Sequence, residues 1–380
     1  MKIGIDIRSA GGQKAGKGWF TFNIARGLLK IDHHNEYILY TDGGVAGFEE
    51  FKNVEMRIVT SRGLFWHRAV SRDVVESGLD YFIAPSSYIV PSMLPASTKV
   101  GAPKVILVVH DLVAFLFKTH QKKAALIERL TLKKALKKAY KVTADSENTA
   151  KDLHKFFEIE DSKILIVPCA ASDEYFPIEK NEGTGAELAS FMAKTGLPEK
   201  FFFAVGTIEP RKNYETLIQA FTMIHEKYPD QNLVIVGGEG WGRVEIEKMI
   251  RENYLQKHVH LLGYLTNKTI NKLYNLAQAL VFPSFYEGFG LPPLEAMKAG
   301  CPVLVSDTSS VPEVVGDAGL YFDPTSPSEI ASAMEKIVLD NDGRGGGAGL
   351  RVDLINKGRI QAQKFNWEES ASKILDLIVQ

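Results

Sequence analysis

The sequence predicts an α/β protein made of two Rossmann-like, doubly wound parallel-sheet domains that face a central cleft. Three observations support this class. Short apolar runs rich in β-branched and aromatic residues alternate with helical patterns along all 380 residues, as in parallel sheets with crossover helices. The chain is longer than one hydrophobic core usually fills. A polar segment, residues 179–196, separates two such series, so we expect one domain on either side of it.

The first domain is expected over residues 1–178. Its strand candidates are short runs dominated by Ile, Val, Leu and Tyr, bounded by polar or turn-forming residues. They lie at residues 3–7, 37–40, 56–59, 81–84, 105–109, 141–144 and 164–167. Apolar residues recur at helical spacing over residues 19–31, 121–140 and 147–157. This alternation predicts a parallel sheet covered by helices.

The second domain is expected over residues 197–366, after a linker at 179–196. The same pattern restarts there, with a helix at residues 214–228. Its strands are expected at residues 201–205, 233–236, 259–262, 279–282 and 302–305. We expect a last helix over residues 367–380, packed back on the first domain.

Composition excludes several classes of protein. Lys and Arg number 45 against 46 Asp and Glu, so general affinity for nucleic acid is not expected. No apolar run approaches the ~20 residues of a membrane-spanning helix, and Asp6 and Arg8 interrupt the apolar start as a secretion signal would not allow. Cys169 and Cys301 stand alone, without metal-ligand spacing, which favours the reducing cytoplasm.

A basic stretch breaks the charge balance. Residues 118–141 carry nine Lys and Arg and one acid, Glu128. In one helix, a row of lysines would share a face beside leucines and alanines: Lys133, Lys134, Lys137, Lys138 and Lys141. A basic amphipathic helix can bind anionic lipid, whereas most charge runs are solvated surface. Both interpretations, a peripheral contact at the inner face of the membrane and a solvated face, stay open.

Ligands of doubly wound sheets bind beyond the carboxyl ends of the strands. The first loop of this kind, Gly11–Gly18, reads GGQKAGKG between a strand and a helix. It nearly matches the phosphate-binding loop of ATPases and kinases, but Gly18 stands where a hydroxyl would hold Mg²⁺. Three interpretations remain: a P-loop-type ATP-binding protein, a flexible turn, or a backbone that approaches an anionic ligand closely.

Two further loops carry charge. GTIEPRKN, Gly206–Asn213, brings Arg211 and Lys212 to a strand–helix junction, where two cations can balance a diphosphate without a metal; the alternative is a pair of solvated charges. FYEGFGLPPLEAMKAG places Glu287 in a loop and Glu295 about one turn into a helix opened by prolines. Carboxylates there suit sugar and ribose hydroxyls, although acids favour first helical turns in any case.

Together these segments resemble the retaining family 4 glycosyltransferases of the GT-B fold. The motifs GTIEPRKN, VGGEGWG, LGY, FPSFYEGFGLPPLEAMKAG and PVLVS follow one another in family order within Phe201–Ser310. The first half agrees through its glycine loop, VVHD and TADSENTAKDL. Among family branches, the combination is most like bacterial mannosyltransferases of surface-polysaccharide assembly.

The resemblance implies roles for individual residues. The first domain would bind the acceptor and the second the nucleotide-sugar donor. His110 and Glu287 would position the transferred sugar, and Glu295 would bind the donor ribose. The residues implied at the donor diphosphate are Arg211, Lys212, Gly16, Gly18, Phe289, Gly290 and Leu291. The nucleobase would lie near Gly263, Tyr264 and Leu265.

The expected reaction is transfer of a hexose from a nucleotide diphosphate sugar to a hydroxyl of a glycan or lipid-linked acceptor, with retention of anomeric configuration. GDP-mannose is the first donor hypothesis and a UDP-hexose the second. No cofactor or required metal is expected. No protein nucleophile is assigned, Asp111 being a weak candidate. An inactive nucleotide-sugar binding protein stays an alternative.

Other signals favour structural roles. Asp340, Asn341 and Asp342 form a D-x-D pattern of the kind that binds Mn²⁺ in glycosyltransferases of another fold, but it ends a helix far from the motif loops. His258 and His260 alternate at the start of a strand, as on a pleat. We expect no metal site at either place.

Overall fold

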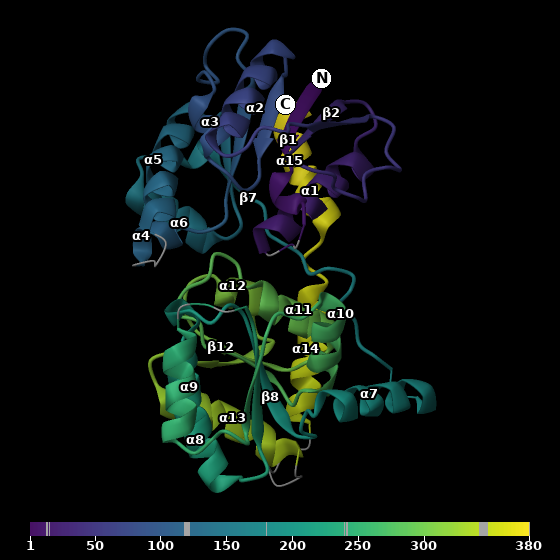
Figure 1. Cartoon of the computed structure of the whole chain (residues 1–380), viewed down its shortest axis with the longest axis vertical. Coiled ribbons are helices and arrows are strands. Elements are labelled where there is room, and N and C mark those ends of the chain that lie inside the picture. The colour runs from purple at the N-terminus through teal and green to yellow at the C-terminus, as the bar shows by residue number, and fades with distance from the viewer. Residues whose placement is uncertain are drawn as a thin grey trace. The chain divides into compact units, whose positions relative to one another are not determined.

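The chain separates into two compact units, each with one parallel sheet (Figure 1). One unit combines Met1–Cys169 with Asn366–Gln380, and the other is Ala170–Phe365. The structure is a computed structural model that describes residues 1–12, 14, 16–117, 122–179, 181–238, 240, 242–341 and 349–379. The predicted class, two α/β domains with doubly wound parallel sheets, is confirmed.

The described part of the first unit has a seven-stranded parallel sheet of order β3-β2-β1-β4-β5-β6-β7. The strands are β1 Lys2–Asp6, β2 Glu36–Thr41, β3 Val54–Ile58, β4 Tyr81–Ala84, β5 Lys104–Val109, β6 Lys141–Ala144 and β7 Ile164–Ile166. Ile3 pairs with Tyr37 of β2 on one side and with Tyr81 of β4 on the other. Strand order therefore reverses between β1 and β4, where doubly wound sheets bind ligands.

Helices flank this sheet and bury their apolar sides against it. They are α1 Gly16–Ile31, α2 Leu64–Glu76, α3 Ile89–Met93, α4 Val113–Leu116, α5 Lys122–Lys138, α6 Glu147–Phe156 and α15 Trp367–Val379, with 3₁₀ turns η1 Arg8–Ala10 and η2 Asp161–Lys163. The C-terminal helix α15 belongs to this unit. Its Trp367 ring lies 5.7 Å from the Phe20 ring of α1. At Gly27 of α1 any Cβ would come within 2.9 Å of the Ala371 side chain, so glycine is what lets the two helices pack this closely.

The second unit repeats the arrangement. Its described strands form a six-stranded parallel sheet of order β10-β9-β8-β11-β12-β13. They are β8 Phe201–Val205, β9 Asn232–Val236, β10 Val259–Leu262, β11 Leu280–Phe282, β12 Val303–Ser306 and β13 Gly319–Phe322. Here the order reverses between β8 and β11, which pair at Phe203 and Leu280.

The first helix of the second unit, α7, precedes residue 197, where this domain was predicted to start, and its other helices follow that residue. The helices are α7 Glu182–Thr195, α8 Tyr214–Lys227, α9 Arg243–Glu252, α10 Asn267–Leu276, α11 Leu291–Ala299, α12 Val311–Val315, α13 Pro327–Asn341 and α14 Leu350–Ala362, with the 3₁₀ turn η3 Pro210–Lys212. Among the described residues, no helix is both long and apolar enough to cross a membrane.

The domain boundary differs from the sequence expectation in two respects. Most of the expected linker, residues 179–196, is the helix α7, which begins with a capping box between Asn181 and Thr184. The segment before it, residues 170–178, belongs to the second unit. The amides of Phe176 and Ile178 donate to the side chains of Asn271 and Asn275 on α10, and these bonds attach the segment to the second unit.

Candidate active site

Two charged loops leave neighbouring strands at the point where the second sheet reverses its order. GTIEPRKN follows β8, and the loop with Glu287 follows β11. Because β8 and β11 are adjacent and parallel, their carboxyl ends share one edge of the sheet. This is the position at which open α/β sheets bind ligands.

The β8 loop is fixed by hydrogen bonds to the β11 loop. Asn213 adopts the left-handed conformation, with φ of 56°, between η3 and α8. Its Nδ2 donates to the carbonyl oxygens of Pro283 (3.0 Å) and Pro324 (2.7 Å), and Phe285 N–H donates to the carbonyl of Arg211 (2.9 Å). These bonds hold Arg211 and Lys212 against the loop that carries Glu287.

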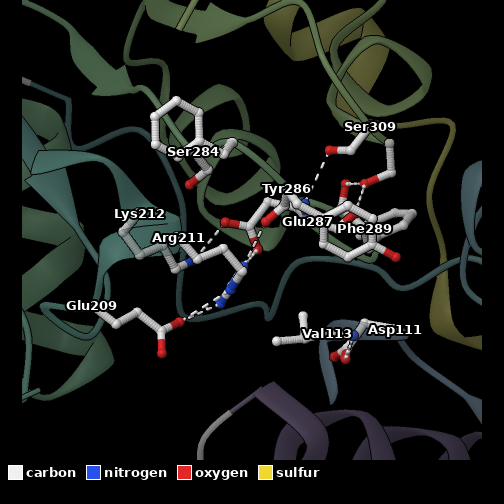
Figure 2. Close-up of polar contacts among 12 residues, drawn as sticks. Asp111, Val113, Glu209, Arg211, Lys212, Ser284, Tyr286, Glu287, Phe289 and Ser309 are labelled. Atoms are coloured by element: carbon white, nitrogen blue, oxygen red, sulfur yellow. Dashed lines mark hydrogen bonds and ion pairs between the residues drawn. The ribbon is translucent and has the colours of Figure 1, made fainter. Parts of the chain in front are cut away.

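A partly buried charge cluster results, which we call the cation cluster and define as Glu209, Arg211, Lys212 and Glu287 (Figure 2). Lys212 Nζ lies 2.6 Å from Glu287 Oε1, and Arg211 Nη1 lies 2.8 Å from Glu287 Oε2. Arg211 Nη2 donates to Glu209 Oε1 at 2.6 Å, and Nη1 also donates to the carbonyl of Tyr286. Two cations thus face two carboxylates.

Burial makes these charges strongly interdependent. Lys212 and Glu287 are each 8% exposed. Burial alone raises the pKa of Glu287, but Lys212 and Arg211 outweigh it and hold that pKa below its usual value. Burial lowers the pKa of Lys212, and Glu287 opposes this. Ionised Glu287 therefore offsets the charge of the two cations, Arg211 and Lys212.

Beyond Glu287 the chain turns into the helix α11. Gly290 precedes the helix with φ of 114°, which strongly favours glycine. Ser310 Oγ donates to the carbonyls of Glu287 (2.9 Å) and Phe289 (2.7 Å), and Glu287 N–H donates to Ser309 Oγ (3.0 Å). The carbonyls of this loop are thus bonded towards the Ser309–Ser310 turn. The N–H groups of Gly290 and Leu291 lie at the helix N-terminus, which suits anions.

Glu295 lies apart from the cation cluster in its contacts. It is the fifth residue of α11, as predicted, and its Oε2 accepts from the hydroxyl of Tyr274 on α10 at 3.3 Å. Burial raises its pKa to about 7, although hydrogen bonds from Tyr274 and Tyr175 act in the opposite direction. Its charge therefore changes near neutral pH, unlike that of Glu287.

The expected nucleobase region follows β10. Gly263 and Tyr264 are exposed, and Leu265 is partly buried. The neighbouring β9 loop approaches the β8 loop so closely that a Cβ on Gly237 would lie 2.0 Å from the carbonyl oxygen of Gly206. A glycine is therefore required at position 237. Trp241 of the VGGEGWG motif lies outside the described residues.

In the first unit, His110 directly follows β5 and is buried. Its Nδ1 lies 2.7 Å from Asp145 Oδ2, and its Nε2 lies 2.6 Å from the carbonyl oxygen of Pro85. Both partners are acceptors, and together they fix the orientation of the imidazole ring. Cys169 Sγ donates to the same carboxylate oxygen at 3.4 Å.

Of the two glycines expected at the donor diphosphate, Gly16 and Gly18, one is needed for packing of the loop. A Cβ on Gly18 would lie 2.5 Å from the carbonyl oxygen of Ser9, whereas one on Gly16 would meet nothing within 4 Å. Gly18 thus permits the close approach of α1 to η1, a role that the sequence did not predict. Gln13 and Ala15 of this loop lie outside the described residues.

A pocket of about 520 Å³ opens beside this loop. Its walls come from the chain after β1, β2 and β4, including Arg8, Lys17, Asp42 and Ser86. The Arg8 guanidinium lies 4.4 Å from the centre of the Trp66 ring. The pocket occupies the switch point of the first sheet, where a ligand is expected.

The predicted lysine row is only partly a helix face. Lys133, Lys134 and Lys137 are exposed on α5. Lys138 Nζ donates to the carbonyls of two residues of the 92–94 segment, and Lys141 belongs to β6 because α5 ends at Lys138. The row of five shrinks to three.

The remaining candidates agree with structural roles. The Asp340 carboxylate accepts the amides of residues 349–351 and so caps α14, while Asp342 lies outside the described residues. His260 lies in β10 with His258 just before it. Within the described part of the chain, no group of three or more His, Cys, Asp or Glu side chains is placed to hold a metal ion.

Sequence reasoning missed two partners of the site residues. Glu209 holds Arg211, and Asp145 pairs with His110. Both lie within motifs that were recognised, GTIEPRKN and TADSENTAKDL. The sequence offered a signal for Glu209, an acid only two positions before Arg211. It offered none for Asp145, which is 35 positions after His110.

Comparison with known families agrees with this two-part architecture. Residues 15–175 match the model of Glycosyltransferase Family 4, and residues 187–361 match that of Glycosyl transferases group 1. O-antigen chain mannosyltransferase B of Escherichia coli is 29% identical over 279 residues, which cover 72% of this chain and 69% of that protein. The serotype-specific mannosyltransferase WbdA of Escherichia coli is 28% identical over 372 residues, covering 92% of this chain but only 43% of WbdA.

Solved structures show the same fold at low sequence identity. Sucrose-phosphate synthase from Thermosynechococcus elongatus is 19% identical, with a TM-score of 0.76 over 100% of this chain and 98% of that chain. HepE of Anabaena, solved in complex with UDP and glucose, is 16% identical, with a TM-score of 0.76 over 100% and 99%. The two parallel-sheet units thus define a GT-B fold. The chain belongs to the family 4 glycosyltransferases, and it resembles bacterial mannosyltransferases.

Proposed function

We propose that this glycosyltransferase transfers a hexose from a nucleotide diphosphate sugar to a hydroxyl of a glycan or lipid-linked acceptor, with retention of configuration. The observation that carries the proposal is the partly buried cation cluster at the switch point of the second sheet. Arg211 and Lys212 would bind the diphosphate; in the structure both are paired with Glu287. GDP-mannose is the preferred donor, supported by the likeness to mannosyltransferases.

The cluster suggests an order of events at the donor. The diphosphate replaces Glu287 as the partner of Lys212 and Arg211, because phosphate oxygens complement both cations. The released carboxylate then accepts hydrogen bonds from hydroxyls of the hexose. As the bond to the anomeric carbon breaks, the two cations and the N–H groups at the start of α11 stabilise charge on the leaving diphosphate. No protein nucleophile and no required metal enter this proposal.

Other residues would fix the remaining parts of the substrates. Glu295 would accept hydrogen bonds from the ribose, and the loop with Tyr264 would lie near the nucleobase. His110 would position the hexose. The pocket beside Arg8 and Lys17 is proposed for the acceptor, as part of polysaccharide or glycolipid assembly. A cytoplasmic location and a peripheral contact with the membrane are likewise proposals.

Calorimetric titration tests the donor assignment. Wild-type protein is titrated with GDP, UDP and ATP, each in EDTA and then in Mg²⁺. We expect GDP to bind in EDTA, because side chains and not a metal ion would contact the diphosphate. GDP should bind more tightly than UDP, as a GDP-mannose donor requires. Tighter binding of UDP would indicate a UDP-hexose as the donor in place of GDP-mannose. Binding of ATP alone, and only with Mg²⁺, would contradict the proposal and favour the glycine loop as a P-loop.

A further inference from the structure

Two buried tyrosines bond to Glu295 from outside the helix that carries it. Tyr274 comes from α10, a neighbour of α11 (Figure 1), and is 1% exposed; its hydroxyl donates to Glu295 Oε2 at 3.3 Å. Tyr175 comes from the segment before α7 and is 2% exposed; its hydroxyl also bonds to Glu295. Glu295 keeps part of its surface exposed, so a ligand can approach it. Two buried donors thus meet one accessible carboxylate.

Packing fixes the position of the Tyr274 hydroxyl. The Tyr274 ring centre lies 5.2 Å from that of Phe203 on β8 and 5.8 Å from that of Tyr175, both in edge-to-face arrangement. The hydroxyl oxygen lies 3.2 Å from the carbonyl oxygen of Pro292 as well as 3.3 Å from Glu295 Oε2. It has one hydrogen for two acceptors, and the bond to an ionised carboxylate is the stronger one. The hydroxyl therefore donates to Glu295 when that side chain is charged.

The segment that carries Tyr175 is attached to both α10 and α11. The amide of Phe176 donates to Asn271 Oδ1 on α10 at 3.1 Å. Lys298 Nζ on α11 lies 2.8 Å from Asp173 Oδ1. Because these bonds lie on either side of position 175, they fix the tyrosine relative to both helices.

We propose that Tyr274 and Tyr175 are positioning residues for ribose recognition, which hold the Glu295 carboxylate where it accepts both hydroxyls of the donor ribose. An ionised carboxylate has two oxygens with about four lone-pair sites. The tyrosines use some of these sites, and the two ribose hydroxyls would use others. A side chain that binds a ligand needs such support, because a loosely held group loses the geometry of its hydrogen bonds. The proposal rests on the proposed function, in which Glu295 binds the ribose, and it adds the two residues that make this contact selective for ribonucleotides.

The tyrosines also favour the charged form of Glu295. Burial raises the pKa of Glu295 to about 7, and the hydrogen bonds from both tyrosines oppose this effect. Loss of a tyrosine hydroxyl should therefore raise that pKa further, so that the carboxylate ionises only at higher pH. The other titratable groups that act on the two tyrosines, or lie one turn away on α11, are Glu174, Tyr264, Cys301 and Lys298.

Nucleotides with and without ribose hydroxyls test the proposal. Wild type, Tyr274→Phe, Tyr175→Phe, the double tyrosine variant and Glu295→Gln are titrated with GDP and with dideoxy-GDP, which lacks both hydroxyls, in EDTA and at pH values below and above 7. UDP and its dideoxy form replace them if wild type binds UDP more tightly. The measured quantity is the ratio of the two dissociation constants, in which losses common to both nucleotides cancel. The control, Tyr228→Phe, removes a hydroxyl that donates to another glutamate of this unit, Glu335, at 2.7 Å.

We expect wild type and the control to prefer GDP over dideoxy-GDP by roughly tenfold or more. Tyr274→Phe and Tyr175→Phe should each lower this ratio about threefold, and the double variant should approach Glu295→Gln. Both tyrosine variants should also move the rise of GDP affinity to higher pH. A double variant with the wild-type ratio would overturn the proposal. So would an equal loss of affinity for both nucleotides, which a purely structural role of the tyrosines predicts.

The same titrations separate this inference from the donor assignment. If Glu295→Gln loses the preference while the tyrosine variants keep it, the ribose role of Glu295 stands and the positioning role fails. If wild type binds both nucleotides equally, Glu295 does not bind the ribose; the inference then fails with that role, while the diphosphate contacts of the cation cluster are unaffected. If neither GDP nor UDP binds, the proposed function fails and the inference fails with it. Thermal melts of each variant show that it is folded.

Discussion

Substitutions of Glu287 and of Lys212 should rank in opposite orders for stability and for diphosphate binding. Glu287→Gln leaves Lys212 buried beside Arg211 without the carboxylate that both now contact at 2.6 and 2.8 Å. Removing one partner of a buried ion pair costs about 3–5 kcal/mol. In a unit of this size, each kcal/mol lowers the melting temperature by about 2–4 °C, so a decrease of about 10 °C is expected.

Lys212→Met should be less costly. Glu287 keeps its bond to Arg211, and the methionine side chain suits a position beside the Phe282 ring. We expect a loss of about 1–2 kcal/mol. The order reverses for GDP: without Glu287 the cations no longer have a competing carboxylate, so Glu287→Gln should bind GDP at least as tightly as wild type. Loss of a charge-assisted contact in Lys212→Met should weaken binding by about 1.5–3 kcal/mol, or tenfold to a hundredfold.

Differential scanning calorimetry and titration with GDP in EDTA measure the two effects on the same samples. The double variant Lys212→Met with Glu287→Gln completes the cycle and should be less destabilised than the sum of the single variants. Equal weakening of GDP binding by the two single variants would refute the competition between Glu287 and the diphosphate. So would a Glu287→Gln variant that melts at the wild-type temperature.

Four further predictions follow from other contacts. The raised pKa of Glu295 means that the folded state binds an extra proton between about pH 4.5 and 7; stability therefore falls as pH rises through this range. Glu295→Gln should remove that dependence in urea titrations, and a variant with the wild-type pH profile would contradict it. Wild-type affinity for GDP should rise as pH passes through about 7, because ionised Glu295 accepts ribose hydroxyls. Unchanged affinity between pH 6 and 8 would count against the ribose role. Gly18→Ala should cost about 1–3 kcal/mol through its contact with Ser9, whereas Gly16→Ala should be neutral or stabilising in a thermal melt; equal melting temperatures would show that the Ser9 contact is not limiting. Asp145→Asn should cost about 1–3 kcal/mol, because it weakens the 2.7 Å contact with His110 Nδ1; a variant that melts at the wild-type temperature would show that this contact does not stabilise the first unit.

The sequence predicted most strands because their signal is local. β4, β6, β8 and β10 have the predicted bounds. β4 and β8 consist of apolar residues alone, whereas β6 and β10 combine β-branched residues or leucines with Lys141, Thr143 and His260. Helix α7 was missed because Gly183 and Gly185 lower helix propensity in its first turns, while the capping box of Asn181 and Thr184 supports the helix start. Helix α5 ends at Lys138, two residues before its predicted end, and Lys141 lies in β6 as the strand prediction had it, so only its place in the helical lysine row was wrong.

The candidate site, too, was predictable from the sequence only in part. Motif loops and strand ends predicted that Arg211, Lys212 and Glu287 lie at one edge of a sheet. Their direct pairing was not predictable, because Lys212 and Glu287 are 75 positions apart and only the adjacency of β8 and β11 brings them together. The contacts of His110 were hidden for the same reason. A loop sequence indicates which charges are available, and the fold decides which of them neutralise one another.

A crystal structure of the chain with GDP, grown in EDTA, would test the central claim most directly. The account predicts that oxygens of the diphosphate lie within hydrogen-bond distance of Lys212 Nζ and the Arg211 guanidinium, and that Glu287 no longer contacts Lys212. GDP bound at the Gly11–Gly18 loop alone, with the Lys212–Glu287 ion pair intact, would contradict it.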